Sequence, residues 1–255
     1  LQKTEVTKAQ WDAVRAWGLK NGYPDLSEGG GTAPNHPVQT VSWYDVVKWC
    51  NARSEMDSIT PCYYTNPAQT AIYRTGNNDL TSKMVKWLAN GYRLPTETEW
   101  EKAARGGLSG KRFPWGDTIS HEEANFRNSG DEAYQKGGTG YHPTYKPDGG
   151  IITIVGIPPT APVGSFAATG YGLYDMAGNV MEWCWDLHGK YPSALETDPR
   201  GVVSSVSRVL RGGGYGGPAC FVCVANRCNQ YPRFMGDEVG FRLAQSQSAQ
   251  QAAGQ

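Results

Sequence analysis

Turn-forming residues interrupt this sequence so often that it can form only a few short regular elements. The 255 residues include 32 glycines and 16 prolines. From Gly110 to Tyr171, glycine, proline, asparagine and aspartate alternate with aromatic residues. A stretch of that length inside a compact domain needs buried side chains or a functional constraint to hold it in place. We therefore expect a loop-rich fold in which buried aromatic rings fix this long excursion.

Three segments carry helix signals. A Ser or Thr at the start, in two cases followed three residues later by Gln or Glu, can accept hydrogen bonds from the free N–H groups of the first turn. These signals predict a helix from Thr7 to about Trp17, one after Ser42 with Trp43, Val46, Val47 and Cys50 on a shared face, and one over Glu97–Arg105 closed by Gly106.

Charge and cysteine usage exclude several classes of function. The formal net charge is zero, so the chain lacks the basic surface that nucleic acids require. No apolar run approaches the ~20 residues that span a bilayer, so we expect no transmembrane segment. Six cysteines are too few for a disulfide scaffold. The first residues, Leu1 to Thr7, have the pattern of the middle of a strand rather than of its start. We therefore expect any export signal to have preceded them.

The segment from Arg208 to Leu243 constrains function more than any other. It contains three motifs that look fixed, R-V-L-R-G-G at its start, V-A-N-R in its middle and V-G-F-R-L at its end. The short runs between them follow neither the 3.6-residue period of a helix nor the alternation of a strand. Small, aromatic and thiol side chains mixed on a loop are typical of a recognition surface.

These motifs carry a family resemblance, together with Val41–Asp45, Gly91–Glu101, Phe113–Gly116 and Gly170–Trp183. In this order they resemble the formylglycine-generating-enzyme, or sulfatase-modifying-factor, family over nearly the whole chain. The resemblance implies an α+β protein with a variant C-type lectin fold, loop-rich and with little regular secondary structure. It predicts a single domain over residues 1–244. The low-complexity Gln, Ser and Ala composition of residues 245–255 predicts a disordered tail.

One branch of the family consists of copper-dependent oxidases that convert a sulfatase cysteine to formylglycine. The resemblance implies that such an enzyme needs a Ser in a G-G-S-Y element and a cysteine pair further on. Here Gly214 stands at the position of that Ser, and Cys220 and Cys223 lie closer to Arg227 than the enzyme's pair does to its Arg. We therefore expect no enzyme activity and no catalytic cofactor, with the oxidase kept as the alternative function.

A second branch fits better, the variable proteins of diversity-generating retroelements. In them an Asn-rich template is copied with errors at adenines, so each altered codon reaches many residue types but not Lys, Glu, Gln, Met or Trp. The irregular positions obey this restriction, and Gln230 and Met235 are left out because they do not. The predicted ligand-binding positions, called the variable set below, are Gly214, Tyr215, Gly216, Gly217, Pro218, Cys220, Phe221, Cys223, Cys228, Asn229, Tyr231, Phe234, Gly236 and Asp237.

The resemblance also implies a structural calcium ion in the Gly170–Trp183 motif. Its ligands would be Asp175, the carbonyls of Gly178 and Val180, and Glu182, and oxygen ligands of this kind suit calcium. The two carboxylates could equally cap turns by accepting hydrogen bonds from neighbouring N–H groups. Both alternatives stay open at the level of sequence.

Together these patterns predict a ligand-binding protein whose fixed lectin-type scaffold displays a diversified C-terminal surface. Tyr215, Phe221, Tyr231 and Phe234 are the expected contact residues, because aromatic rings give large contact area at low entropic cost. The partner is a protein or a glycan rather than a nucleic acid, and the sequence does not choose between the two. Relatives of this kind imply a bacterial cell surface or periplasmic location, as a lipoprotein whose signal is absent from this chain.

Overall fold

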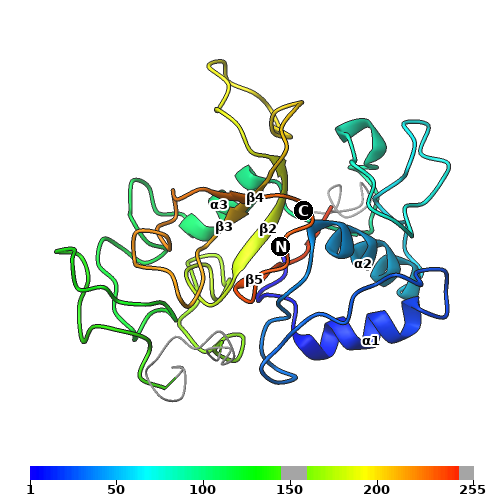
Figure 1. The fold of residues 1–255 in the computed structure, drawn as a ribbon. Helices are drawn as coiled ribbons and strands as arrows, with labels where there is room; N and C mark the ends of the chain where they lie inside the picture. Colours follow the sequence, from blue (N-terminus) through cyan, green and yellow to red (C-terminus); the bar gives the residue numbers. More distant parts are fainter. Residues whose placement is uncertain (145–159, 247–255) are drawn as a thin grey trace, which may run out of the picture.

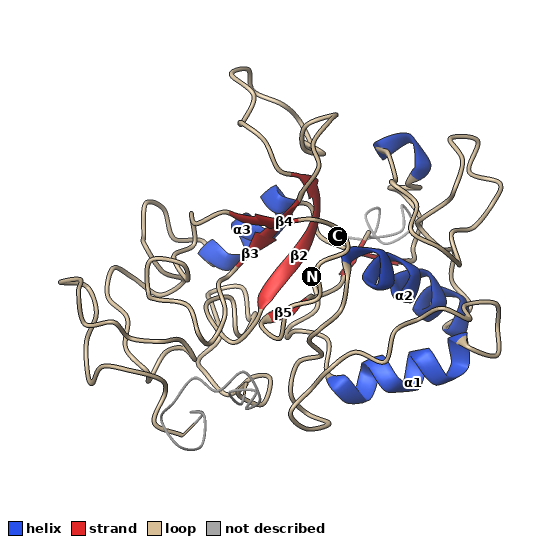
Figure 2. Ribbon diagram, viewed as in Figure 1, coloured by secondary structure: helices blue, strands red, loops and turns tan. Residues whose placement is uncertain are grey.

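The computed structural model describes residues 1–144 and 160–246. Loops make up most of the chain (Figure 2), and the regular elements are short. In chain order they are α1 (Lys8–Gly18), α2 (Trp43–Met56), the 3-10 turn η1 (Ser82–Met84), β1 (Tyr92–Arg93), α3 (Glu97–Arg105), β2 (Met181–Leu187), β3 (Arg208–Arg211), β4 (Cys228–Gln230), β5 (Val239–Gly240) and β6 (Ala244–Gln245).

All three predicted helices form, and local chemistry explains where they begin. Thr7 and Thr96 each accept a hydrogen bond from the third residue of α1 and α3, and the Gln or Glu at that position bonds back to the cap. Ser42 caps α2 in the same position. Helix α3 ends at Gly106, whose φ of 54° is a left-handed conformation that glycine adopts without strain.

A four-stranded sheet with the order β4-β3-β2-β5 lies at the centre of the molecule (Figure 1). Strand β3 is antiparallel to both β2 and β4, whereas β5 is parallel to β2. The two ends of the chain meet beside it, because the Val6 N–H donates to the Phe241 carbonyl. This arrangement places the start and the end of the Arg208–Leu243 segment in the central sheet, as β3 and β5.

The last strand corrects the expected start of the tail. Gln245 pairs with Tyr92 in the β1–β6 ladder, and the Ser246 hydroxyl donates to the Trp87 carbonyl. The ordered domain therefore continues past residue 244. Residues 247–255, the remainder of the predicted tail, lie outside the described residues.

Aromatic rings fill the core. Trp11 of α1 stacks on Trp49 of α2 with ring centroids 5.7 Å apart, and Phe241 packs edge-on against both. A second cluster forms around Trp100 of α3. A third lies under the long loops and contains the buried Phe113 and Phe126. The predicted fixing of the 110–171 excursion by rings is thus confirmed for its described part; residues 145–159 lie outside it.

The cysteines are free thiols in this structure. Cys50, Cys62 and Cys184 are fully buried, and burial raises the pKa of all three. In the part of the chain that the structure describes, no helix has the length and apolarity needed to cross a bilayer.

Candidate binding surface

The variable set begins where strand β3 turns away from the sheet. Gly212 and Gly213 have φ values of 89° and 70°. A Cβ on Gly213 would lie 2.7 Å from the Phe221 carbonyl oxygen, so the close approach of two backbone segments requires glycine here. The turn sends the chain into a loop over residues 214–227, which packs against the 112–142 loops.

Within this loop, buried anchors alternate with exposed residues. Ala219 and Val222 are fully buried in the third core cluster, and Val224 is buried in the second. Between them Cys220 is exposed and Phe221 is 47% exposed. The variable set omits all three of these anchors. The side chains that hold the loop are therefore separate from those that it displays.

Two arginines of the fixed motifs hold the loop to helix α3. Arg211 donates to Glu101 at 2.5 Å and to the Val224 carbonyl at 2.9 Å. Arg227 forms a bidentate pair with Glu97, with distances of 2.6 and 2.7 Å. Bidentate Arg–carboxylate pairs are strong and directional. These contacts fix the end of the loop without using a residue of the variable set.

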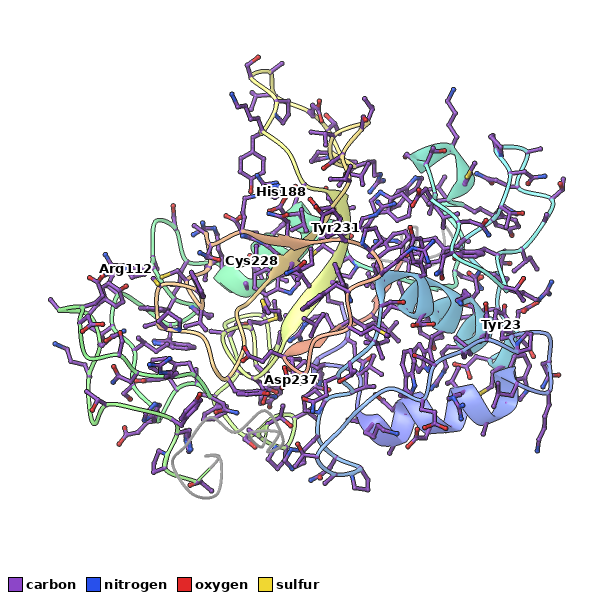
Figure 3. All side chains as sticks on the ribbon, in the orientation of Figure 1. Tyr23, Arg112, His188, Cys228, Tyr231 and Asp237 are labelled. Atoms are coloured by element: carbon purple, nitrogen blue, oxygen red, sulfur yellow. The ribbon has the colours of Figure 1, made fainter. Side chains whose placement is uncertain are left out.

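The second part of the variable set leaves edge strand β4 and crosses the start of α2. The Trp43 N–H donates to the Pro232 carbonyl and the Thr40 N–H donates to the Gly236 carbonyl. Tyr231 is 64% exposed and Phe234 is 37% exposed. Figure 3 places Cys228 and Tyr231 near one end of the sheet and Asp237 near the other. The variable set therefore forms two patches, one on the 214–227 loop and one from β4 to Asp237.

The structure divides the variable set by exposure. Six members are exposed: Cys220, Phe221, Asn229, Tyr231, Phe234 and Asp237. Six are half-buried: Gly216, Gly217, Pro218, Cys223, Cys228 and Gly236. Gly214 and Tyr215 are buried, so the prediction that Tyr215 is an exposed contact residue is wrong.

Burial of Gly214 and Tyr215 has an identifiable cause. The Tyr215 N–H donates to the Asn179 carbonyl, and this bond holds Tyr215 against the Gly170–Trp183 motif. Glu238 covers the turn, since a Cβ on Gly214 would lie 2.4 Å from its Oε2. Burial, followed by the negative charges of Asp237 and Glu238, raises the pKa of Tyr215. Sequence reasoning could not place Glu238 over this turn, because its position depends on the β2–β5 pairing.

Sequence reasoning also missed residues that adjoin the surface. Met235 is 52% exposed although the codon restriction excluded it. Arg112 stacks on Tyr134 at 4.2 Å between guanidinium carbon and ring centroid, beside Cys220 and Cys223. The basic character of Arg112 and the aromatic character of Tyr134 were visible in the sequence. Nothing in the sequence linked these two residues to cysteines about 100 positions further on.

The thiols of the loop are poorly suited to act as nucleophiles. Burial raises the pKa of Cys223 and of Cys228, which keeps both thiols protonated at neutral pH. Cys223 donates to the Ala219 carbonyl at 3.5 Å. Cys220 is exposed. Arg112 lowers the pKa of Cys223 and Arg211 lowers that of Cys228, but burial has the larger effect on both thiols.

The predicted calcium motif forms a buried polar cluster. Glu182 is fully buried, and its carboxylate accepts hydrogen bonds from Trp100 at 2.8 Å and from Arg242 at 2.6 and 2.7 Å. Asp175 accepts from the Gly164 N–H at 2.6 Å through one oxygen, and its other oxygen has no hydrogen-bond partner among the described residues. Glu5, also buried, has one unpaired oxygen as well.

Three carboxylates thus share one buried region with a single guanidinium, that of Arg242. Burial raises the pKa of Asp175 to about 6 and that of Glu5 well above its usual range. Surplus negative charge and unpaired oxygens suit a hard cation. However, Arg242 occupies both oxygens of Glu182, and no three His, Cys, Asp or Glu residues converge on one point among the described residues. The residues fit calcium only in part, and calcium binding at Asp175, Gly178, Val180 and Glu182 stays a prediction.

Comparison with known proteins identifies the family. A profile of the family described as sulfatase-modifying factor enzyme 1-like domain matches residues 1–247, so the chain belongs to this family. A formylglycine-generating enzyme of Thermomonospora curvata is 33% identical over 235 residues, 89% of this chain and 58% of that protein. Chaperone protein LppX of Paenibacillus barcinonensis is 32% identical over 221 residues, 84% of this chain and 68% of that protein. The chain thus spans less than two thirds of the Thermomonospora enzyme.

A solved structure gives the corresponding fold. Treponema denticola variable protein 1 superposes with a TM-score of 0.67 at 28% identity, covering 95% of this chain and 82% of that one. The expected α+β, loop-rich fold of the formylglycine-generating-enzyme type is confirmed, as is the resemblance to variable proteins.

Proposed function

We propose that this member of the sulfatase-modifying-factor family is a binding protein whose ligand is recognised by a diversified surface. The surface comprises the exposed and half-buried members of the variable set. Its two patches lie on the 214–227 loop and on the segment from β4 to Asp237. The fixed motifs around them supply the sheet, the glycine turn and the arginine contacts. In this account the protein acts as the variable protein of a diversity-generating retroelement.

One observation carries the proposal: within the 219–224 stretch, the members of the variable set are more exposed than the residues that the set omits. Ala219, Val222 and Val224 are buried, whereas Cys220 and Phe221 face solvent. A loop selected for packing would place its large ring inside, because burial of a Phe side chain is worth about 2–3 kcal/mol. Here the largest side chain of the stretch points outward, and the smaller aliphatic ones hold the loop.

The composition of the surface favours a macromolecular ligand. Phe221, Tyr231 and Phe234 are partly exposed rings next to small residues, the combination that antibody loops use to contact folded partners. We infer a protein or glycan ligand, bound by the protein at a bacterial cell surface or in the periplasm. A lipoprotein anchor belongs to this proposal.

A display experiment tests the proposal. The six exposed positions are randomised with the residue types reachable from Asn codons, and the library is selected against one immobilised protein, hen egg-white lysozyme. We expect folded binders that differ at these six positions. A matched library randomises six exposed positions of α1 and its flanking loops and is expected to yield none. Binders at equal frequency from both libraries would contradict a dedicated surface.

The oxidase remains the alternative function, because formylglycine-generating enzymes are among the relatives. Gly214 in place of the Ser and the raised pKa values of Cys223 and Cys228 weigh against it. The test is incubation with copper, oxygen and a cysteine-containing sulfatase-type peptide. We expect the peptide mass to stay unchanged. Conversion to formylglycine that is lost in both Cys220→Ser and Cys223→Ser would establish the enzyme instead.

A further inference from the structure

A cavity separate from the variable set lies where the sheet meets its longest connection. Residues 188–207, called the arm below, join β2 to β3 and extend away from the body of the molecule (Figure 1). The His188 N–H donates to the Ser207 carbonyl and closes the base of the arm. Between the arm and residues 80–83 lies a cavity of about 730 Å³, within the size range of small-molecule sites.

The floor of this cavity contains a buried guanidinium that forms no ion pair among the described residues. Arg208 is 2% exposed and lines the cavity. Its guanidinium donates to the Trp185 carbonyl at 2.6 Å and to the Leu80 carbonyl at 3.1 Å, and its Nε has no acceptor. The guanidinium carbon lies 3.8 Å from the Trp43 ring centroid. Stacking on an aromatic ring stabilises a cation but does not neutralise it.

The other buried arginines all form ion pairs. Arg93, Arg211 and Arg242 each have a carboxylate oxygen within 2.6 Å. Among the described residues, Arg208 forms no ion pair. Asp79 and Asp186 act on it only at longer range, and they accept hydrogen bonds from the Tyr44 hydroxyl and the Glu97 N–H. A buried charge left unpaired is costly, so an arginine in this position favours an anionic ligand.

The rest of the lining defines the shape and charge of that ligand. Leu80, Trp185 and Val202 supply apolar walls, and Lys83 and Arg200 stand at the mouth. The Arg200 guanidinium carbon lies 3.9 Å from the Trp87 ring centroid. Glu196 and Asp198 also line the mouth but are exposed, so their charges are screened by water, whereas that of Arg208 is not.

We propose that this cavity binds an organic carboxylate with an apolar body. The carboxylate pairs with Arg208, and the apolar body packs between Leu80, Trp185 and Val202. Such a carboxylate can belong to a free organic acid or to the C-terminus of a peptide. The cavity is lined by no residue of the variable set, so the proposal does not depend on the proposed function of that set.

Calorimetry with four probes tests the proposal. The probes are 4-phenylbutyrate, its neutral amide, N-acetyl-Leu-Phe as the free acid, and the amide of that dipeptide. We expect at least one acid to bind about tenfold or more tightly than its amide, as a charge-assisted hydrogen bond predicts. If only one acid binds, that acid identifies the source of the carboxylate. If both bind, the site accepts a free organic acid and a peptide C-terminus alike. Equal binding of acid and amide, or no binding below about 10 mM, would overturn the proposal.

Two sets of variants locate the binding. The double variant Lys83→Glu/Arg200→Glu replaces the two positive charges of the mouth with negative ones and should weaken acid binding about tenfold. The control Lys20→Glu/Lys102→Glu makes the same change in net charge at exposed residues outside the cavity and should leave binding unchanged. Arg208→Gln should abolish the preference for acid over amide in protein whose melting curve is cooperative. Equal loss in the control, or full binding by the mouth variant, would place the ligand elsewhere.

Discussion

Two tyrosines of the variable set occupy opposite environments and provide a matched test of scaffold and surface. Tyr215 is 1% exposed, whereas Tyr231 is 64% exposed. A tyrosine buries roughly 200 Å² when fully enclosed, so Tyr215→Ala should cost about 3–5 kcal/mol of unfolding free energy. Tyr231 buries about a third of that area, roughly 70 Å², and at ~25 cal/mol per Å² its replacement by Ala should cost less than about 2 kcal/mol.

The assay is urea unfolding of the two variants and the wild type, with the slope of free energy against denaturant compared across all three. We expect a difference of about 2–3 kcal/mol between the variants, or roughly 5–10 °C in melting temperature for a domain of this size. Ligand affinity should change in the opposite order, with Tyr231→Ala losing binding and retaining the fold. Equal destabilisation by the two variants would refute the division into anchors and displayed residues.

Three further expectations concern the fixed part of the molecule. Chelation should lower the melting temperature and calcium should restore it. At a hundredfold excess over Kd, calcium should add about 2.7 kcal/mol to the free energy of unfolding. A melting temperature that does not respond, or that responds equally in Asp175→Asn, would contradict the site. Burial raises the pKa of Asp186 to about 7, so its contribution to stability is complete below about pH 4 and is lost as pH rises through 7. The stability of Asp186→Asn relative to wild type should therefore rise between about pH 4 and about pH 7, by at most about 4 kcal/mol. A stability difference that stays constant with pH would contradict this expectation. Arg227→Met leaves Glu97 with a weaker partner and should cost about 1–3 kcal/mol in urea unfolding, whereas Arg233→Met on the surface should cost under about 0.5 kcal/mol.

The sequence predicted those features that local chemistry determines. The capping residues Thr7, Ser42 and Thr96 set the starts of the three helices, because each cap bonds only within its own first turn. The variable set includes Phe221 and omits Val222, and this difference matches the exposure of Phe221 and the burial of Val222.

Features that depend on distant pairings could not be predicted. Tyr215 is buried because the 175–182 motif and Glu238 enclose it, and both positions follow from the β2–β5 pairing. Glu182 matches a calcium ligand in sequence, yet its carboxylate faces Arg242, 60 residues away in the chain. Arg208 looked like one more residue of a fixed motif, and only the fold shows that it lies buried beside a cavity and forms no ion pair among the described residues.

The central claim is that variation is confined to the displayed positions while the anchors stay constant. Sequencing the coding region of codons 208–243, with its flanking DNA, across many cells of one population tests it directly. We expect a near-copy of this region with Asn codons at the variable set beside a reverse transcriptase gene. Differences between cells should fall on the codons of the exposed members, with Ala219, Val222, Val224 and Arg227 unchanged. Differences spread evenly over anchors and displayed positions, or the absence of any template copy, would contradict the account.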